Sequence, residues 1–412
     1  MKYHDDNNEA FVCQWLTDIT KIDEIQWKAI FGKKHIKGFN FFKSIQQSNI
    51  PNVEFHYFII SENSKLVAIV PCFYFKLDLI DLLEESILKN ILLKIRGVFP
   101  RFLKIRTLVI GSYASSCEYF VGICDEYKNN QEAIFSLIKI HLKKKAKKIK
   151  AKLTLIKEVR ETQIDNVRAT LGEDFCFCKS FPNTFVPVFS ECRPYPSALK
   201  PNHQRRHKKM RKEYDKFNTW EIAKDITPYK NIFEEMYLNV LRKAKNKMEI
   251  LNGEFFVNLN KNLPDNTFFI ISRDVNKLIR AMALVVEEED RLVPLYLGMN
   301  YRDDDTRIFY INMLFKVIET AEQKGKEIVE LGQTSYYPKI MSGAFVEFIY
   351  YGFSSYNTII KRILRRVVQL NLFDIKLLPH IYKKEKSDSI ISKSENEYGF
   401  KICNLEIVKK DS

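Results

Sequence analysis

The sequence predicts an α/β fold of the α+β type, with two tandem units that are each a mixed sheet flanked by helices, and a basic C-terminal appendage. Two observations support this prediction. A strand-turn-strand pattern beginning Phe-Ile-Ile-Ser occurs at residues 58–61 and again at residues 269–272, and such repeats indicate duplicated structural units. The 412 residues also exceed what one ordinary core accommodates, so two domains are the default expectation.

The same order of elements follows each repeat. In the first copy, apolar residues recur at helical spacing from Ala133 to Lys148, and a strand is expected at residues 151–156. In the second copy, the helical pattern runs from Ile308 to Lys324, and a strand is expected at residues 327–331. Apolar residues three and four apart mark one face of a helix. A hairpin, a helix and a strand are therefore predicted twice.

The domain boundary is expected in a proline-rich segment. Pro194 and Pro196 stand close together, and proline disfavours a continuous helix or strand. We place the first unit at residues 10–190 and the second at residues 191–355. A basic amphipathic tail is expected at residues 356–412.

The most informative segment, Glu330–Gly343, follows the last predicted strand. The strand ends at Gly332, and a polar, aromatic loop then leads to Lys339, four residues before Gly343. In open α/β sheets, ligands bind at the carboxyl ends of strands. The pattern therefore predicts a binding edge at this loop.

This segment resembles the C-terminal half of the FemAB-like and BioF2-like acyltransferases of the GNAT superfamily. The features that carry the resemblance are a helix, Gly325, a strand, Leu331-Gly332, a tyrosine and then Lys339. The resemblance covers residues 10–355 and implies two GNAT-like domains. It also implies transfer of an acyl or aminoacyl group from acyl-CoA or aminoacyl-tRNA to an amine acceptor, in envelope, polysaccharide or specialised-metabolite synthesis.

The resemblance assigns roles within the loop. A lysine near the matching glycine steadies the oxyanion of acyl transfer in Fem-type enzymes, and Lys339 matches that position. A cation placed in advance where negative charge develops lowers the barrier. Tyr336 is the second catalytic candidate, and Gln333 and Tyr337 are candidate substrate-binding residues. The alternative is an ordinary loop with a surface lysine.

A strongly basic segment supplies the other candidate site. Six of the ten residues in 203–212 are Arg or Lys, and the resemblance places an Arg-rich helix after the segment Tyr195–Leu199. Arg205, Arg206 and Lys209 are therefore candidates to bind an anionic donor or acceptor, because guanidinium groups match phosphate geometry. The alternative is a solvated helix face.

One departure from the GNAT pattern affects the choice of donor. The segment Tyr301–Arg307 precedes the second helix and contains three aspartates, whereas a glycine-rich loop normally cradles pyrophosphate at such a helix N-terminus. Acetyl-CoA bound through the usual loop is therefore disfavoured, which favours aminoacyl-tRNA or an unusual acyl donor. The sequence assigns no general base, and Glu287–Glu289 are interpreted as a hairpin turn.

The net charge of +15 favours an anionic partner, such as nucleic acid, a phosphorylated substrate or an anionic membrane surface. The basic amphipathic segment Ile359–Leu370 is expected to dock on the second unit or to lie on a membrane. No run of about 18 apolar residues is present, and residues 1–10 lack an apolar signal region. We therefore expect a cytoplasmic protein, with a membrane-peripheral location as the alternative.

Other classes of site find no support. The eight cysteines are scattered, and Cys176-x-Cys178 lacks the usual zinc spacing, so reduced thiols and no metal are expected. No P-loop or Gly-x-Ser-x-Gly motif occurs. Two alternatives to an enzyme stay open: a non-catalytic binding protein for an anionic polymer or partner, and a peripheral membrane protein that acts through the tail.

Overall fold

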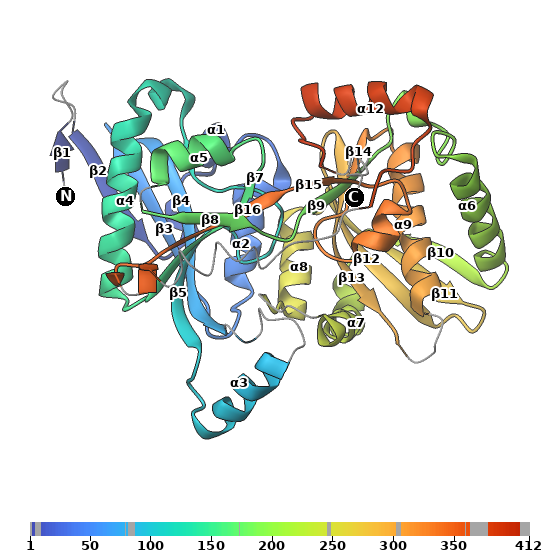
Figure 1. Ribbon diagram of the computed structural model, residues 1–412, viewed down its shortest axis with the longest axis horizontal. Coiled ribbons are helices and arrows are strands. Elements are labelled where there is room, and N and C mark those ends of the chain that lie inside the picture. Colours follow the sequence, from blue (N-terminus) through green and yellow to red (C-terminus); the bar gives the residue numbers. More distant parts are fainter. Residues whose placement is uncertain are drawn as a thin grey trace, which may run out of the picture.

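The computed structural model contains two mixed sheets with helices packed around them (Figure 1). The structure describes residues 2–4, 10–78, 80, 87–172, 174–244, 249–301, 306–358, 360–362 and 378–403.

The first sheet has the strand order β1-β2-β3-β4-β5-β7-β16-β8, and β6 pairs with β4. Its strands are β1 (Lys2–His4), β2 (Ala10–Leu16), β3 (Glu54–Glu62), β4 (Lys65–Asp78), β5 (Lys104–Ile110), β6 (Gly122–Ile123), β7 (Leu153–Arg160), β8 (Cys176–Lys179) and β16 (Ile349–Ser354). The helices of this half are η1 (Ile19–Lys21), α1 (Glu24–Phe31), η2 (His35–Lys37), α2 (Phe39–Gln47), α3 (Ile87–Val98), η3 (Asp125–Asn130), α4 (Gln131–Lys148) and α5 (Ile164–Leu171).

The second sheet has the strand order β10-β11-β12-β13-β14-β9-β15. Its strands are β9 (Asn183–Pro187), β10 (Asn218–Ala223), β11 (Thr267–Asp274), β12 (Ile279–Glu287), β13 (Arg291–Met299), β14 (Ile328–Glu330) and β15 (Phe345–Glu347). The helices of this half are η4 (Ser190–Cys192), α6 (Pro201–Tyr214), η5 (Thr227–Tyr229), α7 (Lys230–Lys243), α8 (Gly253–Asn262), α9 (Thr306–Gln323), α10 (Tyr336–Ile340) and α12 (Lys384–Asn396).

The topology confirms the predicted duplication. The antiparallel hairpin β3–β4 corresponds to β11–β12. In each copy a long helix, α4 or α9, then leads into a strand that pairs in parallel with an earlier strand of the same copy, β7 with β5 and β14 with β13. Parallel neighbours require such a crossover connection. The fold class predicted from the repeat, two tandem α/β units, is therefore confirmed.

The two units exchange strands, which the sequence did not indicate. β9 precedes the expected boundary but pairs with β14 in the second sheet. β16 lies near the end of the expected second unit but pairs with β7 in the first sheet. The expected boundary between residues 190 and 191 therefore does not separate the strands of the first sheet from those of the second. Through this exchange, the strand that follows each crossover helix, β7 or β14, pairs with a strand from the other half of the chain.

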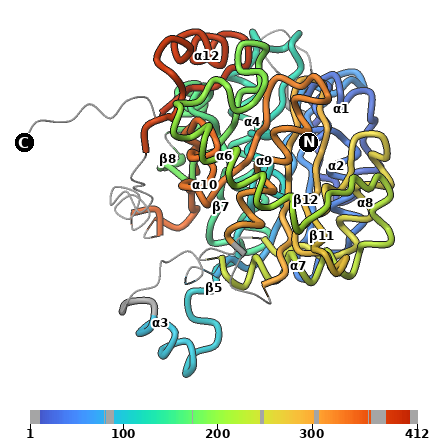
Figure 2. Tube along the Cα trace, turned by 90° about the vertical axis from the view of Figure 1, so that its right-hand side faces the viewer, coloured from blue at the N-terminus to red at the C-terminus, as the bar shows by residue number. Residues whose placement is uncertain are grey.

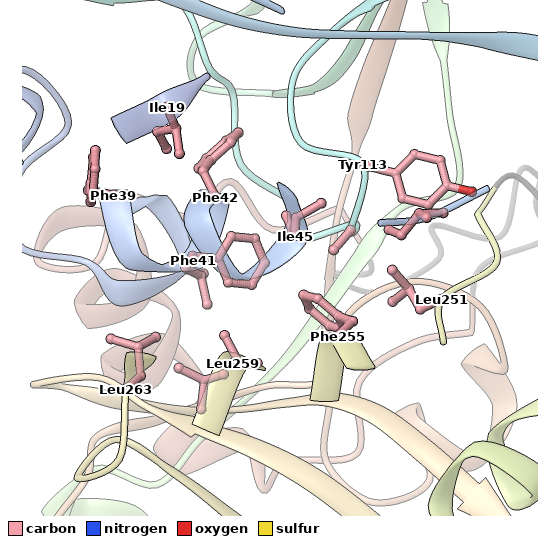
Figure 3. Close-up of a cluster of buried hydrophobic side chains, with 14 of the residues drawn as sticks. Ile19, Phe39, Phe41, Phe42, Ile45, Tyr113, Leu251, Phe255, Leu259 and Leu263 are labelled. Carbon is pink, nitrogen blue, oxygen red and sulfur yellow. The ribbon is translucent and has the colours of Figure 1, made fainter. Parts of the chain in front are cut away.

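A continuous apolar core joins the two halves where α2 of the first faces α8 of the second. Figure 3 shows the aromatic and aliphatic side chains of these helices directed toward one another. The rings of Phe41 and Phe255 meet edge to face with centroids 6.2 Å apart, and both side chains are fully buried. Such burial is expected to stabilise the junction because each large aromatic side chain removes a large apolar area from water.

The described part of the tail packs against the second half of the chain. Ile381, Tyr382, Ile390 and Phe400 are buried against the second sheet, and the Tyr382 hydroxyl donates to the carbonyl of Gly343 at 2.6 Å. These apolar residues are widely spaced within a polar stretch, so their common face was not evident from the sequence. The amphipathic segment predicted at 359–370 falls mostly outside the described residues.

Helix α3 projects from the tip of the β4–β5 pair, away from both sheets (Figure 2). Among the described helices, none combines the length and the hydropathy that crossing a bilayer requires.

Candidate active site

The candidate site is formed where β13 and β14 separate. Their parallel pairing extends over only Arg291↔Ile328 and Leu292↔Val329. β13 continues to Met299 while paired with β12 on its other side, and no other described strand covers the side that faces the gap. Its backbone groups there are available to a ligand, because an unpaired strand edge presents N–H and C=O groups.

A β-bulge lies at the point of separation. The register between β12 and β13 shifts after Leu284, so that Pro294 and Tyr296 have partners on β12 and Leu295 does not. The extra residue of a bulge is left out of the ladder and bends its strand. The corresponding pairing in the first half, β4 with β5, has no such shift. Leu295, the extra residue of the bulge, lines the cavity at this gap.

A cavity of about 580 Å³ fills this gap. Alternate side chains of β13 lie on opposite faces of the sheet, and Leu292 packs in the cluster containing α9 whereas Val293 packs in the cluster containing α7. Because both helices contribute to the cavity wall, the cavity passes through the sheet. Its inner wall comes from the first half, including Leu155 of β7 and Phe353 of β16.

Glu249 is the carboxylate best placed to act on a ligand in the cavity. One carboxylate oxygen accepts hydrogen bonds from the N–H and the hydroxyl of Ser115 at 2.9 and 2.8 Å, and the other accepts from the hydroxyl of Tyr296 at 2.8 Å. The ammonium of Lys157 lies 3.5 Å away. The side chain of Glu249 is 14% exposed. These contacts hold a carboxylate on the wall between the two halves.

Glu330 also lines the cavity, but other groups already bind its oxygens. One oxygen accepts from Arg160 at 2.6 Å and from Asn183 at 2.7 Å, and the other accepts from Arg291 at 3.0 Å. Although burial opposes ionisation, the two arginines lower the pKa of Glu330 below its ordinary value. Arg160 lies 3.3 Å from Glu118 and 3.2 Å from Glu347 as well. This buried network connects both sheets and holds the base of the cavity in place.

Lys339 is buried, and its ammonium group closes the loop after β14. It donates to the carbonyls of Leu331, Gly332 and Gln333 at 2.8, 3.0 and 2.7 Å. An ammonium has three donors, so all three have backbone partners. Burial lowers the pKa of Lys339 to about 7. The geometry is that of a residue that positions the loop, and contact with an oxyanion would require release of one carbonyl. The predicted oxyanion role of Lys339 stays a prediction.

The loop that Lys339 holds is conformationally strained. Gly332, Thr334 and Ser335 have φ angles of 70°, 63° and 52°. The left-handed region is costly for residues with a Cβ atom, particularly a β-branched one. Strain of this kind persists only where surrounding contacts enforce it, and it clusters at ligand-binding sites. The three hydrogen bonds of Lys339 supply such contacts.

The other predicted loop residues occupy different positions. Gln333 lines the cavity, and its amide donates to the carbonyl of Phe181 at 2.8 Å. Tyr336 lies outside the cavity lining and directs its hydroxyl to the carbonyl of Pro182 at 3.3 Å. Tyr337 is also outside the lining and is exposed. The structure therefore brings Gln333 and Lys339 together at the cavity, and it does not bring the two tyrosines there.

The basic residues predicted to bind an anionic donor or acceptor are not part of this site. Helix α6 begins at Pro201 and packs beside α9 at the far side of the second half (Figure 1). Arg205, Arg206 and Lys209 do not line the cavity, and Arg205 and Lys209 are exposed. The buried side of α6 instead presents His207 and Tyr214 to its neighbours. Anion binding on the outer face stays a prediction.

Two other kinds of chemistry find little support in the cavity. Cys117 lines it, but burial, together with Glu158 and Glu330, raises the pKa of this thiol well above its ordinary value. A protonated thiol is a poor nucleophile. The described residues contain no group of three His, Cys, Asp or Glu side chains placed to hold a metal ion. The aspartates of the segment 301–307 fall outside the described residues.

Sequence reasoning missed Glu249, Ser115 and Tyr296. They come from three segments far apart in the chain, and no motif in the sequence around any of them marks it as a site residue. Only the β-bulge at Leu295 had a local signal, since Pro294 interrupts an otherwise regular strand pattern and proline within a strand often marks a bulge.

Comparison with protein-family models gives no match, and comparison with curated proteins gives none. Among solved structures, the crystal structure of FemX aligns with a TM-score of 0.52 at 10% identity, over 85% of this chain and 100% of that one. The chain shares the fold of FemX. The FemAB-like fold expected from the sequence is thereby confirmed.

Two further structures align over similar lengths. L-PGS from Bacillus licheniformis has a TM-score of 0.48 at 8% identity, over 87% of this chain and 98% of that one. A tandem GNAT protein from the clavulanic acid biosynthesis pathway has a TM-score of 0.47 at 7% identity, over 83% of this chain and 98% of that one.

Proposed function

We propose that the protein is an N-acyltransferase that moves an acyl or aminoacyl group from an activated donor to an amine acceptor. The observation that carries the proposal is the gap between β13 and β14, where an unpaired strand edge, a bulge and a carboxylate meet at one cavity. Acyl-CoA and aminoacyl-tRNA are the two donor classes. The Fem-type fold is compatible with this reaction and does not by itself establish it.

The backbone of β13 is proposed to bind the donor. An extended donor arm pairs with the free edge of the strand, as a peptide does when it adds to a sheet. In this proposal the reacting carbonyl lies beside the bulge, and the donor to it is the N–H of Leu295, a residue that has no Cα partner on β12. A preorganised N–H at the developing oxyanion lowers the barrier to attack. In this scheme Lys339 is a positioning residue that holds the opposite side of the gap.

Glu249 is proposed as the general base. The acceptor enters as an ammonium, loses one proton to Glu249, and its nitrogen lone pair then attacks the donor carbonyl carbon. A C–N bond forms, the C–S bond of a thioester or the C–O bond of an aminoacyl ester breaks, and the second nitrogen proton goes to the leaving sulfur or oxygen. Ser115 and Tyr296, which donate to Glu249, keep the carboxylate oriented.

The test is transfer by the full chain from acyl-CoA and from aminoacyl-tRNA to a panel of amino acids and amino sugars, with amide products detected by mass spectrometry. Glu249→Gln is expected to lower the rate by about 10²–10⁴, the usual contribution of a general base. Glu289→Gln, at an exposed turn position outside the cavity, is the matched control. Donor binding without any amide product would instead favour a non-catalytic binding protein.

A further inference from the structure

The wall of the cavity is largely apolar, and this property bears on the nature of the acyl group. Leu241 comes from α7, Leu297 from β13, Leu314 from α9, and Leu155 and Phe353 from the first sheet. The Asp, Glu, Lys, Arg and His side chains of the described lining are Glu249, Arg307, Glu330 and Lys339. Apolar side chains thus approach the same space from both halves of the chain.

Most of these charged groups already have partners. Glu330 and Lys339 are held by the contacts described above. The Arg307 guanidinium lies over the ring of Tyr337, 5.9 Å from its centroid. The Glu249 side chain is 14% exposed, and Arg307 is exposed as well. The cavity is therefore polar at these two side chains and at the loop after β14, and apolar over most of the rest of its surface.

We propose that the cavity holds the hydrocarbon chain of a fatty acyl donor. This inference rests on the proposed function and specifies its substrate class. Ligand pockets of roughly 300–1,000 Å³ take molecules of drug size, and the volume here, about 580 Å³, is well within that range. An acetyl group fills only a small part of such a space and leaves its apolar lining without contacts. A long hydrocarbon chain fills it and removes that lining from water.

The geometry also gives the orientation of the chain. Donor carbonyl and acceptor amine meet near Leu295 and Glu249, and the hydrocarbon runs inward toward Leu155 and Phe353 of the first sheet. Each buried methylene contributes about 0.8 kcal/mol, which corresponds to roughly a fourfold gain in affinity. Affinity is therefore expected to rise with chain length until the cavity is full, and then to level off.

The experiment is isothermal titration calorimetry of the full chain with acetyl-CoA, octanoyl-CoA and palmitoyl-CoA, below the concentrations at which the long thioesters form micelles. At least tenfold tighter binding of octanoyl-CoA or palmitoyl-CoA than of acetyl-CoA is expected. Leu297→Trp, which narrows the cavity from β13, is expected to weaken binding of the longer thioesters at least tenfold, and by a larger factor than it weakens binding of acetyl-CoA. Leu278→Trp, at an exposed leucine outside the cavity, is expected to bind all three as the unaltered protein does.

The outcomes separate the inference from the proposed function. Equal affinity for all three thioesters, or tightest binding of acetyl-CoA, would overturn the fatty acyl assignment and leave acyl transfer standing. Absence of binding with every thioester would overturn both the assignment and an acyl-CoA donor. If Leu297→Trp does not fold, Ala244→Trp narrows the same cavity from the partly exposed end of α7. The fatty acyl assignment then requires that this variant no longer binds the longer thioesters more tightly than acetyl-CoA.

Discussion

Replacement of Lys339 by methionine tests how the loop after β14 is held. Methionine has a similar length and no hydrogen-bond donor, so the change removes all three bonds from the ammonium to the backbone. The carbonyl of Gly332 keeps the hydroxyl of Thr184 as a donor at 2.6 Å. The carbonyls of Leu331 and Gln333 lose the hydrogen bond that they accept from the lysine. An unsatisfied buried polar group costs about 1–3 kcal/mol, so the buried contact to Leu331 and the partly buried contact to Gln333 together predict a loss of at most about 2–6 kcal/mol.

Part of that loss is offset because methionine also removes the cost of burying a cation. We therefore expect the free energy of unfolding to fall by about 2–4 kcal/mol at pH 7, measured by urea denaturation. Lys208→Met, at an exposed position of α6, is the control and should change stability by less than about 0.5 kcal/mol. A Lys339→Met variant as stable as this control would refute the anchoring role.

The pH dependence of this pair has a defined sign. Burial lowers the pKa of Lys339 from 10.5 to about 7, so between these values the unfolded chain binds a proton that the folded protein does not. Stability rises with pH wherever the unfolded state binds more protons. The advantage of the unaltered protein over Lys339→Met should thus be smallest below pH 7 and grow toward pH 10, by at most about 1.4 kcal/mol per pH unit. A difference that stays constant or shrinks over this range would contradict the lowered pKa.

Three further substitutions test the frame around the cavity, each by urea denaturation. Arg160→Met leaves the three buried carboxylates around it without their shared cation and should cost about 3–5 kcal/mol, whereas Arg205→Met on the exposed side of α6 should cost almost nothing. Gly332→Ala forces an alanine to a φ of 70° and should cost about 1–2 kcal/mol; Gly97→Ala, inside helix α3 with equal open space, should instead raise local helix stability by about 0.5–1 kcal/mol. Phe255→Ala at the junction of the two halves should cost about 3–5 kcal/mol and leave a single unfolding transition, and two separated transitions would show that the halves fold independently.

Local periodicity was sufficient to predict the repeated elements. The predicted helix from Ala133 to Lys148 is α4, Gln131–Lys148, and the one from Ile308 to Lys324 is α9, Thr306–Gln323. Their amphipathic patterns are long, and long patterns leave little ambiguity. Of the turn predicted at Glu287–Glu289, Glu288 and Glu289 lie in the connection between β12 and β13, and Glu287 is the last residue of β12.

Features that depend on pairing between distant segments were not predictable. Nothing in the sequence of Ile349–Ser354 indicates that this strand pairs with β7 of the first sheet, because its backbone can form the same hydrogen bonds with any strand edge of suitable length. The buried state of Lys339 was missed for a similar reason. A lysine in a polar loop is usually exposed, and its carbonyl partners come together only because the chain turns sharply at Gly332.

The candidate site was predicted in location and only partly in composition. The loop after β14 does line the cavity, through Gln333 and Lys339. Glu249, which the proposed reaction uses as its base, was missed because its partners Ser115, Lys157 and Tyr296 are far from it in the sequence. The net charge predicted an anionic partner. The apolar cavity indicates that the ligand also has an apolar part, which the net charge does not reveal.

Hydrogen exchange of the β13 backbone on addition of palmitoyl-CoA tests the central claim most directly. The account predicts that bound donor protects the amides of residues 295–299 that face the gap, together with those of Gly332 and Gln333, and leaves exchange in α6 unchanged. Binding that protects α6 or another surface, with exchange in β13 unaltered, would contradict the claim that the activated acyl donor occupies the gap between β13 and β14.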